Sequence, residues 1–367
     1  MTENTNVNSI VKQASKQASK QASKQASKQE HTDACQTLVW MCRDCSNVVT
    51  DSIEKADEII NNPKYKRILV SISGGSDSDD VLDLCTKLDI SHKCIYVWFD
   101  TGLEYQATKE HLKYLESKYH INIIREKAIK PIPVSCKEFG QPFLSKRVSD
   151  YVTRLQKHGF QWEDEPFEVL YKKYPKCRSA LRWWCNMWDN KGEKSSQFNI
   201  NRNAYLKEFL ISNHPTFSIS NKCCDYAKKN VAHQAIKQYD AQLNIIGIRK
   251  AEGGVRASAY KRCFDEGDGV DNLRPIFWWN NDDKVEYENT QNVVHSDCYS
   301  VYGLPRTGCV GCPYARDLEG ELKVIEKYEP RLYRAVTNVF SDSYEYRKKY
   351  KEFVKEMKIK GIKPRKD

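Results

Sequence analysis

The 367-residue chain lacks the features that would place it in a membrane or in a secretory pathway. No apolar run approaches the roughly 18 residues that a transmembrane helix needs. The first residues, MTENTNVNSIVKQASK, have no apolar centre of the kind found in secretory signals. GxxxxGKS and GxxxxGKT are also absent, which excludes a lysine-bearing P-loop. We therefore expect a cytoplasmic globular protein without a membrane partner.

Cysteine, in contrast, is abundant, with 14 residues. In a chain without a secretion signal these should be reduced thiols, so that clusters among them indicate metal ligands or reactive groups. Cys85 and Cys94 lie in apolar segments and are expected to fill the core. Cys42 and Cys45 form an isolated CxxC without nearby partners, which favours a partly buried helix face over a metal site.

Positive charge is concentrated at the two ends of the chain. Of the net charge of +10, residues 1–30 carry +3 and residues 341–367 carry +5. The main body is therefore almost neutral, and a solvated, solubilising role for the ends is the simpler interpretation. Basic tails of this kind can still add salt-sensitive attraction to phosphate backbones.

The order of segments predicts an α/β fold. Apolar strands such as RILVSIS, KCIYVWFD and INIIRE alternate with amphipathic helices, a pattern typical of a parallel sheet with helices on both faces and its ligand site at the carboxyl ends of the strands. The KQAS repeats have no apolar stripe that could pack on a core. The predicted parts are a disordered tail (1–34), the first part of the α/β domain (35–130), a helical insertion (131–220), the remainder of the α/β domain with a metal site (221–320), and C-terminal helices with a basic tail (321–367).

A candidate phosphate loop follows the first strand, in the sequence SISGGSDSDD. Two glycines permit conformations that point successive amides at an anion, and the following helix N-terminus adds partial positive charge. Serine hydroxyls can donate hydrogen bonds, and an aspartate can hold Mg²⁺ or cap the helix. An ordinary capped strand-to-helix turn has a similar composition. The candidate phosphate-binding residues are Ser73, Gly74, Gly75, Ser76, Asp77 and Ser78.

The next strand ends in FDTGLEYQAT, which brings Asp100 and Gly102 to the neighbouring carboxyl end. SGGSDS resembles the SGGxDS pyrophosphate loop of the adenine-nucleotide alpha-hydrolase-like superfamily. FDTGLEYQAT resembles the DTGxxFPET element of the phosphoadenosine phosphosulfate (PAPS) reductase family. The resemblance implies a Rossmann-like fold that binds an adenine nucleotide with this loop on its phosphates.

A second constellation consists of two cysteine pairs, Cys223 with Cys224 and Cys309 with Cys312. A CxxC turn presents two thiolates and needs two further ligands to complete a zinc site or an iron-sulfur cluster. Adjacent cysteines on a helix point about 100° apart, so they can share one cluster near a helix end or where the backbone is distorted. A single zinc ion would be more cramped.

These cysteines extend the resemblance to adenylylsulfate (APS) reductases. CCDYAKKNVAHQAI is similar to CCxxRKxxPLxxAL, GIRKAEGGVRA to GxRRxQSxxR, and GLPRTGCVGCPYA to GYPSIGCxPCT. The resemblance implies a 4Fe-4S cluster on the four cysteines and carries nucleotide contacts over to Arg249 and Arg256. Two departures stand out: Ala227 replaces a family arginine, and Cys177 and Cys185 are possible competing ligands.

The reaction is a separate question from the family. The reductases use a nucleophilic cysteine in a C-terminal tail, and here no cysteine follows Cys312. The intact SGGxDS form resembles enzymes that split ATP between its α and β phosphates. We therefore expect an adenylating ATP-pyrophosphatase of sulfur-transfer type that uses Mg²⁺ with ATP. The alternatives are an APS or PAPS reductase with a thiol from elsewhere, and a non-catalytic nucleotide-binding regulator.

The partners predicted besides the adenine nucleotide are a sulfur-donor protein and a nucleic-acid acceptor. Aromatic and basic residues of the helical insertion can stack on bases or form the hydrophobic face of that region, and we favour the hydrophobic face. These residues are Arg178, Arg182, Trp183, Trp184 and Trp188.

Overall fold

The computed structural model describes residues 33–189, 196–253 and 259–365. Most of the predicted KQAS-repeat tail lies outside the described residues, as does the candidate nucleotide contact Arg256. The chain forms two compact units, each assembled from three segments. The first comprises residues 1–98, 107–126 and 232–301, and the second comprises residues 99–106, 127–231 and 302–367.

A six-stranded sheet organises the first unit, with strand order β3-β2-β1-β4-β6-β5. Its strands are β1 (Ile68–Ile72), β2 (Cys94–Asp100), β3 (Ile123–Lys127), β4 (Leu243–Ile246), β5 (Phe264–Asp265) and β6 (Asp271–Leu273). β1 pairs in parallel with β2 and β4, β4 pairs in parallel with β6, and β5 is antiparallel to β6. The sheet is thus mostly parallel, and the predicted α/β fold class is confirmed.

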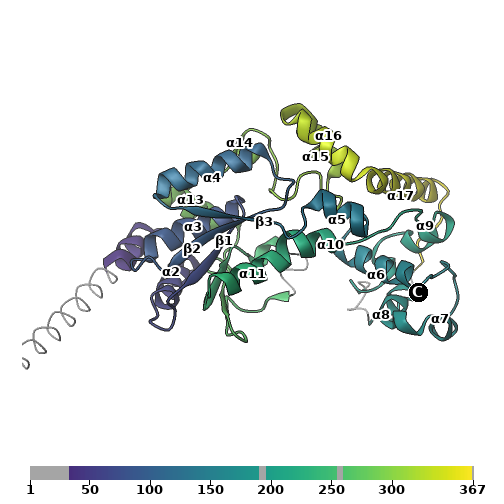
Figure 1. Cartoon of the computed structure of the whole chain (residues 1–367), viewed down its shortest axis with the longest axis horizontal. Coiled ribbons are helices and arrows are strands. Elements are labelled where there is room, and N and C mark those ends of the chain that lie inside the picture. The colour runs from purple at the N-terminus through teal and green to yellow at the C-terminus, as the bar shows by residue number, and fades with distance from the viewer. Residues whose placement is uncertain (1–32, 190–195, 254–258, 366–367) are drawn as a thin grey trace, which may run out of the picture. The chain divides into compact units, whose positions relative to one another are not determined.

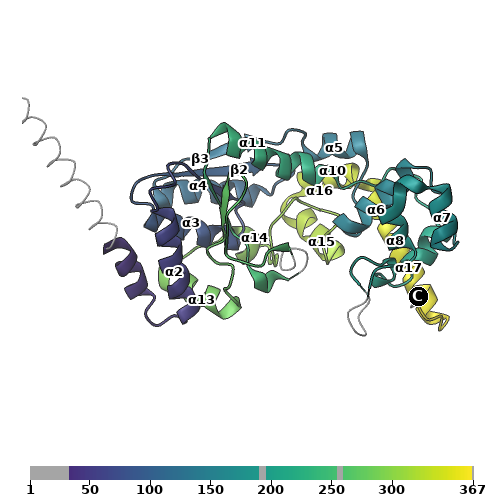
Figure 2. The same ribbon diagram turned by 90° about the horizontal axis from the view of Figure 1, so that it is seen from below.

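Helices flank this sheet on both sides in Figure 1, as expected for parallel strands with buried faces. The helices in this part of the chain are α2 (Asn47–Ile60), α3 (Ser76–Leu88), α4 (Gln106–Tyr119), α11 (Asn230–Gln238), α13 (Asn281–Gln291) and α14 (Asp297–Ser300), with a short 3-10 turn at Lys250–Glu252. α13 begins with a capping box between Asn280 and Asp283. It lies beside α2 in Figure 2, where the Ser46 hydroxyl donates to Asp283 Oδ1 at 2.5 Å.

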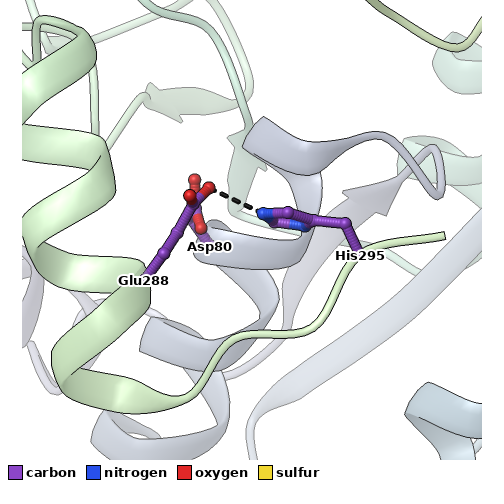
Figure 3. Close-up of side chains that lie close together, drawn as sticks. All are labelled: Asp80, Glu288 and His295. Carbon is purple, nitrogen blue, oxygen red and sulfur yellow. Dashed lines mark hydrogen bonds and ion pairs between the residues drawn. The ribbon is translucent and has the colours of Figure 1, made fainter. Parts of the chain in front are cut away.

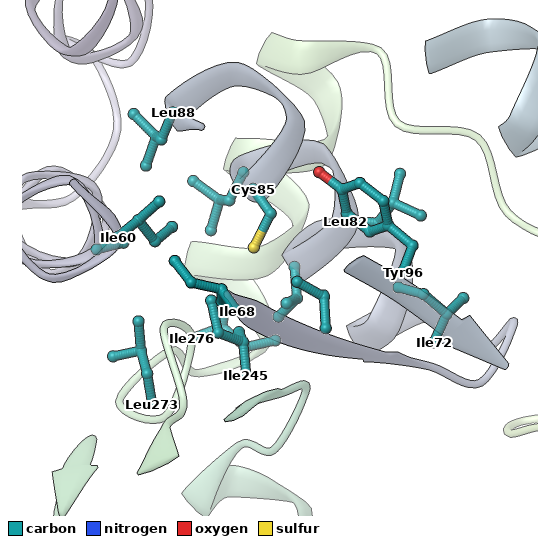
Figure 4. Packing of buried hydrophobic residues seen from close by; sticks show 14 of the residues in the cluster. Ile60, Ile68, Ile72, Leu82, Cys85, Leu88, Tyr96, Ile245, Leu273 and Ile276 are labelled. Atoms are coloured by element: carbon teal, nitrogen blue, oxygen red, sulfur yellow. The ribbon is translucent and has the colours of Figure 1, made fainter. Parts of the chain in front are cut away.

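The core of the first unit lies between the sheet and helices α2, α3 and α4. Figure 4 shows Ile60, Ile68, Leu82 and Leu88 converging around Cys85. Each buried Leu or Ile side chain of this kind contributes about 1.5–3 kcal/mol of hydrophobic stabilisation. Cys85 is fully buried in this cluster, and Cys94 packs against it, as expected for core-filling thiols.

The N-terminal CxxC contributes to the same core. Cys42 is fully buried there and accepts a hydrogen bond from Gln291 Nε2 at 3.4 Å. Cys45 packs at the edge of the core, with its Sγ 3.6 Å from the Thr290 hydroxyl. The predicted partial burial of Cys42 and Cys45 is thus confirmed, but the predicted helix face is wrong, because both residues lie in the turn between the helix at 33–41 and α2.

The second unit is mainly helical. Its helices are α5 (Ile132–Phe139), α6 (Lys146–Lys157), α7 (Phe167–Lys173), α8 (Arg178–Trp184), α9 (Leu206–Ser212), α10 (Lys222–Cys224), α15 (Leu318–Tyr328), α16 (Pro330–Val339) and α17 (Ser341–Ile359). Short 3-10 turns at Pro175–Cys177 and Ile200–Arg202 join them, and a π-helical turn at Asp225–Lys229 follows α10.

A second hydrophobic core fills this unit and contains Trp183 and Trp184, which are 1% and 0% exposed. Both rings are therefore unavailable to stack on bases, which supports the hydrophobic-face interpretation of this segment. Trp188 is half-buried, with the Arg182 guanidinium 3.9 Å from its ring centre. Cys177 belongs to the same core, and its thiol donates to the Arg154 carbonyl at 3.4 Å. No helix among the described residues is long and apolar enough to span a membrane.

Candidate functional site

The predicted phosphate loop joins β1 directly to α3. Within it, the Ser73 amide donates to the Ser78 hydroxyl at 2.9 Å and the Gly75 amide donates to the Ser73 hydroxyl at 3.3 Å. Gly74 has a φ of +67°, and a Cβ there would lie 2.7 Å from Thr108 Cγ2. Glycine is therefore required at this position for its backbone conformation and for the close packing of α4. The two serine hydroxyls fix the loop in a compact turn.

The N-terminus of α3 has the features of an anion site. α3 is 13 residues long, so its aligned peptide dipoles place partial positive charge at the first turn. The Ser76 amide, which has no partner within the helix, donates to the Tyr299 hydroxyl at 2.9 Å. Tyr299 comes from α14, so an oxygen from a distant segment already accepts a hydrogen bond at the end of the loop.

Asp77 is held between two cations. Arg249 Nε donates to Asp77 Oδ1 at 2.9 Å, and Lys284 Nζ lies 3.3 Å from the same oxygen. Burial favours the neutral carboxyl group, but a hydrogen bond with Glu252 and the charges of Lys284 and Arg249 lower the pKa of Asp77. The carboxylate is therefore ionised at neutral pH.

Arg249, which the family resemblance predicts to contact the nucleotide, is held by residues at the start of α13. Its Nη1 donates to the Asn280 carbonyl at 3.2 Å and to Asn281 Oδ1 at 3.0 Å. Gly247 permits this approach, because a Cβ there would lie 2.7 Å from the Asp77 carbonyl oxygen. The side chain is only 8% exposed. Arg249 is thus held in place beside the loop.

Behind Asp77 lies a network of buried charges that tie α3 to α13. Lys284 forms ion pairs with Asp80 and with Glu288, the latter at 2.6 Å. His295 donates from Nε2 to Glu288 at 2.7 Å and from Nδ1 to Asp79 at 2.9 Å. Burial disfavours the imidazolium, but these two carboxylates outweigh it and raise the pKa of His295 to about 9.

Three members of this network are close enough to hold a single metal ion. The ligand atoms of Asp80, Glu288 and His295 all lie within 4.8 Å of one another (Figure 3). However, the Lys284 ammonium already lies against Asp80 and Glu288, and both ring nitrogens of His295 are paired with carboxylates. A cation would have to displace Lys284. We therefore interpret the group as an ion-pair network.

Asp100 and Gly102 belong to the second unit. The Gly102 amide donates to Asp100 Oδ1 at 2.9 Å, and the Asp100 carbonyl accepts from the Ala128 amide at 2.9 Å. Gly102 has a φ of +82°, which favours glycine. Beside them, the Thr101 hydroxyl donates to buried Glu104 at 2.5 Å. Asp100 and Gly102 form a defined turn directly after β2.

The four cysteines proposed as ligands also lie in the second unit. Electrostatic interactions link the Cys224 thiol with those of Cys223, Cys309 and Cys312. Cys223 and Cys224 end α10, where the chain enters the π-helical turn. This is the kind of backbone distortion that adjacent cysteines need in order to face a common centre, and such turns are frequent at functional sites.

Charged residues surround the thiols. Lys228 lies beside Cys309 and Glu104, and negative charge at Cys309 or Glu104 raises the pKa of the lysine. Burial raises the pKa of Cys309 and Cys312, the latter to about 12. Such thiols stay protonated at neutral pH unless a cation stabilises the thiolate form, as a metal centre does. The donor set therefore fits a thiolate-bound metal centre.

Several residues of the two sites could not be identified from the sequence. Cys136 from α5 hydrogen-bonds to Cys223, and Tyr314 lies among the same thiols. Tyr299 and Lys284 meet the phosphate loop from separate segments. Single residues far apart in sequence have no spacing pattern that predicts their contacts. A signal did exist in the acidic run of SDSDD, because acids on the buried face of a helix require positive partners.

The fold and the loop together define an α/β protein with a fold of a nucleotide-binding type. A family model for the phosphoadenosine phosphosulfate reductase domain matches residues 67–179 and 185–315. This is more than half of the chain, which therefore belongs to that family, as the sequence motifs predicted.

Individual relatives match more limited parts of the chain. Adenosine 5'-phosphosulfate reductases from Rhodococcus erythropolis and Neisseria meningitidis are 30% and 33% identical over 25% of this chain and 36% of their own length. The chain thus spans about a third of these curated relatives. An uncharacterised 37.8 kDa protein of Escherichia phage 186 is 24% identical over 68% of each chain.

Two solved structures align with the chain at low TM-scores. A phosphoadenylyl-sulfate reductase from Candida auris, in a phosphate complex, matches with a TM-score of 0.37 and 13% identity over 75% of this chain and 93% of its own. The U34-tRNA thiolase NcsA from Methanococcus maripaludis, with its 4Fe-4S cluster, matches with a TM-score of 0.35 and 11% identity over 84% of this chain and 79% of its own.

Proposed function

We propose that the protein is an adenylating enzyme of the ATP-pyrophosphatase type that serves sulfur transfer. An oxygen of the acceptor attacks the α-phosphorus of ATP, pyrophosphate leaves, and a sulfur nucleophile then displaces AMP from the adenylated acceptor. The sulfur comes from a donor protein, and the acceptor is a nucleic acid. The observation that carries this proposal is the intact loop at the N-terminus of α3, with Arg249 held beside Asp77.

In this proposal each residue of the loop has a separate task. The α3 N-terminus and the amides of Gly75 and Ser76 bind the β and γ phosphates, because those groups carry positive partial charge. The phosphate oxygens then replace the Ser73 and Tyr299 hydroxyls as acceptors of the two amides. Arg249 neutralises charge that develops on the leaving pyrophosphate. Mg²⁺, which arrives with ATP, would bind the Asp77 carboxylate, whose Oδ1 also accepts from Arg249. Asp100 and Gly102 contact the nucleoside.

A 4Fe-4S cluster on Cys223, Cys224, Cys309 and Cys312 is the second part of the proposal. The cluster is supported by the electrostatic interactions among the four thiols, which all belong to the second unit. It is also supported by the π-helical turn after Cys224, the kind of distortion that lets adjacent cysteines face a common centre. When bound, the cluster supplies iron that can bind or polarise a sulfur species.

Pyrophosphate release tests the adenylation step. Anaerobically purified protein should release pyrophosphate from ATP when Mg²⁺ is added together with the acceptor. Asp77→Asn removes the charge that holds Mg²⁺ and orients Arg249, so we expect release to fall by about 100-fold or more, the scale of losing one electrostatic contact in catalysis. Asp268→Asn makes the same chemical change at an exposed loop residue of the first unit and should be silent. Equal rates in the two variants would refute the role of Asp77.

The APS reductase relatives support a second candidate, reduction of APS or PAPS with a thiol from elsewhere. Thiol-dependent sulfite release from either nucleotide, without pyrophosphate release from ATP, would favour it. Tight nucleotide binding with neither product would instead indicate a non-catalytic nucleotide-binding regulator. Iron and sulfide analysis with a visible spectrum tests the cofactor, and a colourless protein with one zinc ion would overturn the cluster assignment.

A further inference from the structure

The hydroxyl group of Tyr314 is buried and has no hydrogen-bond partner among the described residues. Burial raises the pKa of Tyr314, and Ser149 is close enough to lower it in part. However, the Ser149 hydroxyl donates its hydrogen to the Phe143 carbonyl at 3.0 Å and accepts from the Phe143 amide at 2.9 Å. Buried polar groups without a partner are rare in native proteins, and each one calls for an explanation such as an ion or cofactor that completes the site.

The surroundings of Tyr314 indicate which group can accept a hydrogen bond from its hydroxyl. Tyr314 follows Cys312 by two residues, and its hydroxyl interacts electrostatically with the thiols of Cys224, Cys223 and Cys312. These are three of the four proposed cluster ligands, and they come from two segments of the chain. The unpaired O–H therefore lies among sulfurs that would carry negative charge in a cluster.

The backbone around Tyr314 is held in place by α17. Arg347 donates to the carbonyls of Pro313 and Ala315 on either side of Tyr314, the latter at 2.7 Å. The Tyr344 hydroxyl donates to the carbonyl of Gly311. Arg347 is 8% exposed, so one buried guanidinium positions both neighbours of Tyr314. The backbone on both sides of Tyr314 is thus fixed by α17.

We propose that Tyr314 is a positioning residue that donates a hydrogen bond from its hydroxyl to a sulfur of the iron-sulfur cluster. The inference rests on the cluster of the proposed function and adds a specific contact to it. A hydrogen bond to a cluster sulfur stabilises the more negative, reduced state, and this is one of the means by which proteins set cluster potentials. Tyr314 therefore raises the reduction potential of the cluster, which gains one electron without any change in its atoms.

A redox titration of the Tyr314→Phe variant tests this role. The ring keeps its shape and loses only the hydroxyl, so iron and sulfide content should stay at the wild-type level. At a fixed potential, set with dithionite and followed by electron paramagnetic resonance, the ratio of reduced to oxidised cluster should fall by about threefold to tenfold. A tenfold change corresponds to 59 mV for a one-electron couple.

Tyr346→Phe is the matched control. It removes the same atom from a tyrosine of the same unit, whose hydroxyl donates to the Asn213 carbonyl. We expect its cluster potential to equal that of the wild type. A cluster-loaded Tyr314→Phe variant with an unchanged potential would overturn the proposal. If the wild-type protein binds no iron, the proposed cofactor itself is wrong, which separates the two failures.

A second variant decides the question if Tyr314→Phe fails to retain its cluster. Incorporation of 3-fluorotyrosine at position 314 keeps the shape of the side chain and makes its O–H a stronger donor. The reduction potential should then rise above that of the wild type. The same substitution at position 346 should leave it unchanged. No rise at position 314, in protein with full iron content, would refute the hydrogen bond.

Discussion

At the scale of single residues, the carboxylates of α3 depend on cations supplied by α13 and the segment after it. Asp79 and Asp80 are fully buried, and each keeps one oxygen without a hydrogen-bond partner among the described residues. Unpaired buried charges cost several kcal/mol, so the ion pairs with Lys284 and His295 are needed for α3 to fold. These pairs in turn hold the loop at its N-terminus.

The imidazolium of His295 makes stability depend on pH. Its pKa is raised from 6.5 to about 9 in the folded protein, so protonation stabilises the fold fully below pH 6.5 and ever less as pH rises through 9. By the linkage relation, the contribution of this group is at most about 3 kcal/mol. In urea unfolding, the free energy of unfolding of His295→Gln should be furthest below that of the wild type at pH 6. The difference between the two free energies should be smaller at pH 10.

His233→Gln serves as the control for this pH profile. It changes an exposed histidine on α11 of the first unit. Its unfolding free energy should follow that of the wild type across the whole range. A difference between wild type and His295→Gln that stays constant from pH 6 to pH 10 would contradict the assignment of the charge to His295.

At the scale of elements, the turn between β1 and α3 tolerates few substitutions. Gly74→Ala adds a Cβ only 2.7 Å from Thr108 Cγ2 in a left-handed conformation. We expect a loss of about 1–3 kcal/mol of stability, measured by urea unfolding, with weaker ATP binding. Thr108→Ser removes that methyl group. The double variant should therefore regain the stability lost to the collision with Cγ2, but not the stability lost because alanine is strained in a left-handed conformation. No recovery would show that the collision is unimportant.

The elements could be predicted from the sequence more completely than the site. The alternation of apolar strands with amphipathic helices defines the sheet because hydrophobic periodicity is local. The loop was recognisable because its glycines and serines are adjacent. The π-helical turn after Cys224 depends on tertiary contacts. The sequence indicated only that adjacent cysteines need a helix end or a distorted backbone to share one cluster. Cys136 meets Cys223 across the fold, and Tyr314, although close to Cys312 in sequence, meets Cys223 and Cys224 from a separate segment. No local pattern encodes these contacts.

At the scale of the whole molecule, the proposed cluster would connect distant parts of one unit. Its ligands come from α10 and from residues 309–312, both in the second unit, whereas the phosphate loop belongs to the first. Metal binding energy becomes folding energy where ligands are not preformed. Removal of iron should therefore loosen the second unit locally and leave the first unit largely unchanged.

Hydrogen exchange can measure this difference. Amides of α10 and of residues 309–316 should exchange at least tenfold faster in iron-depleted protein than in the cluster-loaded form. Amides of α3 in the first unit provide an internal reference and should exchange at the same rate in both. Equal changes in the two units would show that the metal stabilises the chain as a whole.

The position of Arg347 has a consequence for the time at which the site can form. The chain passes between the two units at residues 98, 106, 126, 231 and 301. Arg347, which holds the residues next to Tyr314, lies in α17, after all four proposed ligands in the chain. Cluster insertion in its final environment should therefore wait until α17 has been made and has folded against residues 313–315, which places iron loading late in the formation of the second unit.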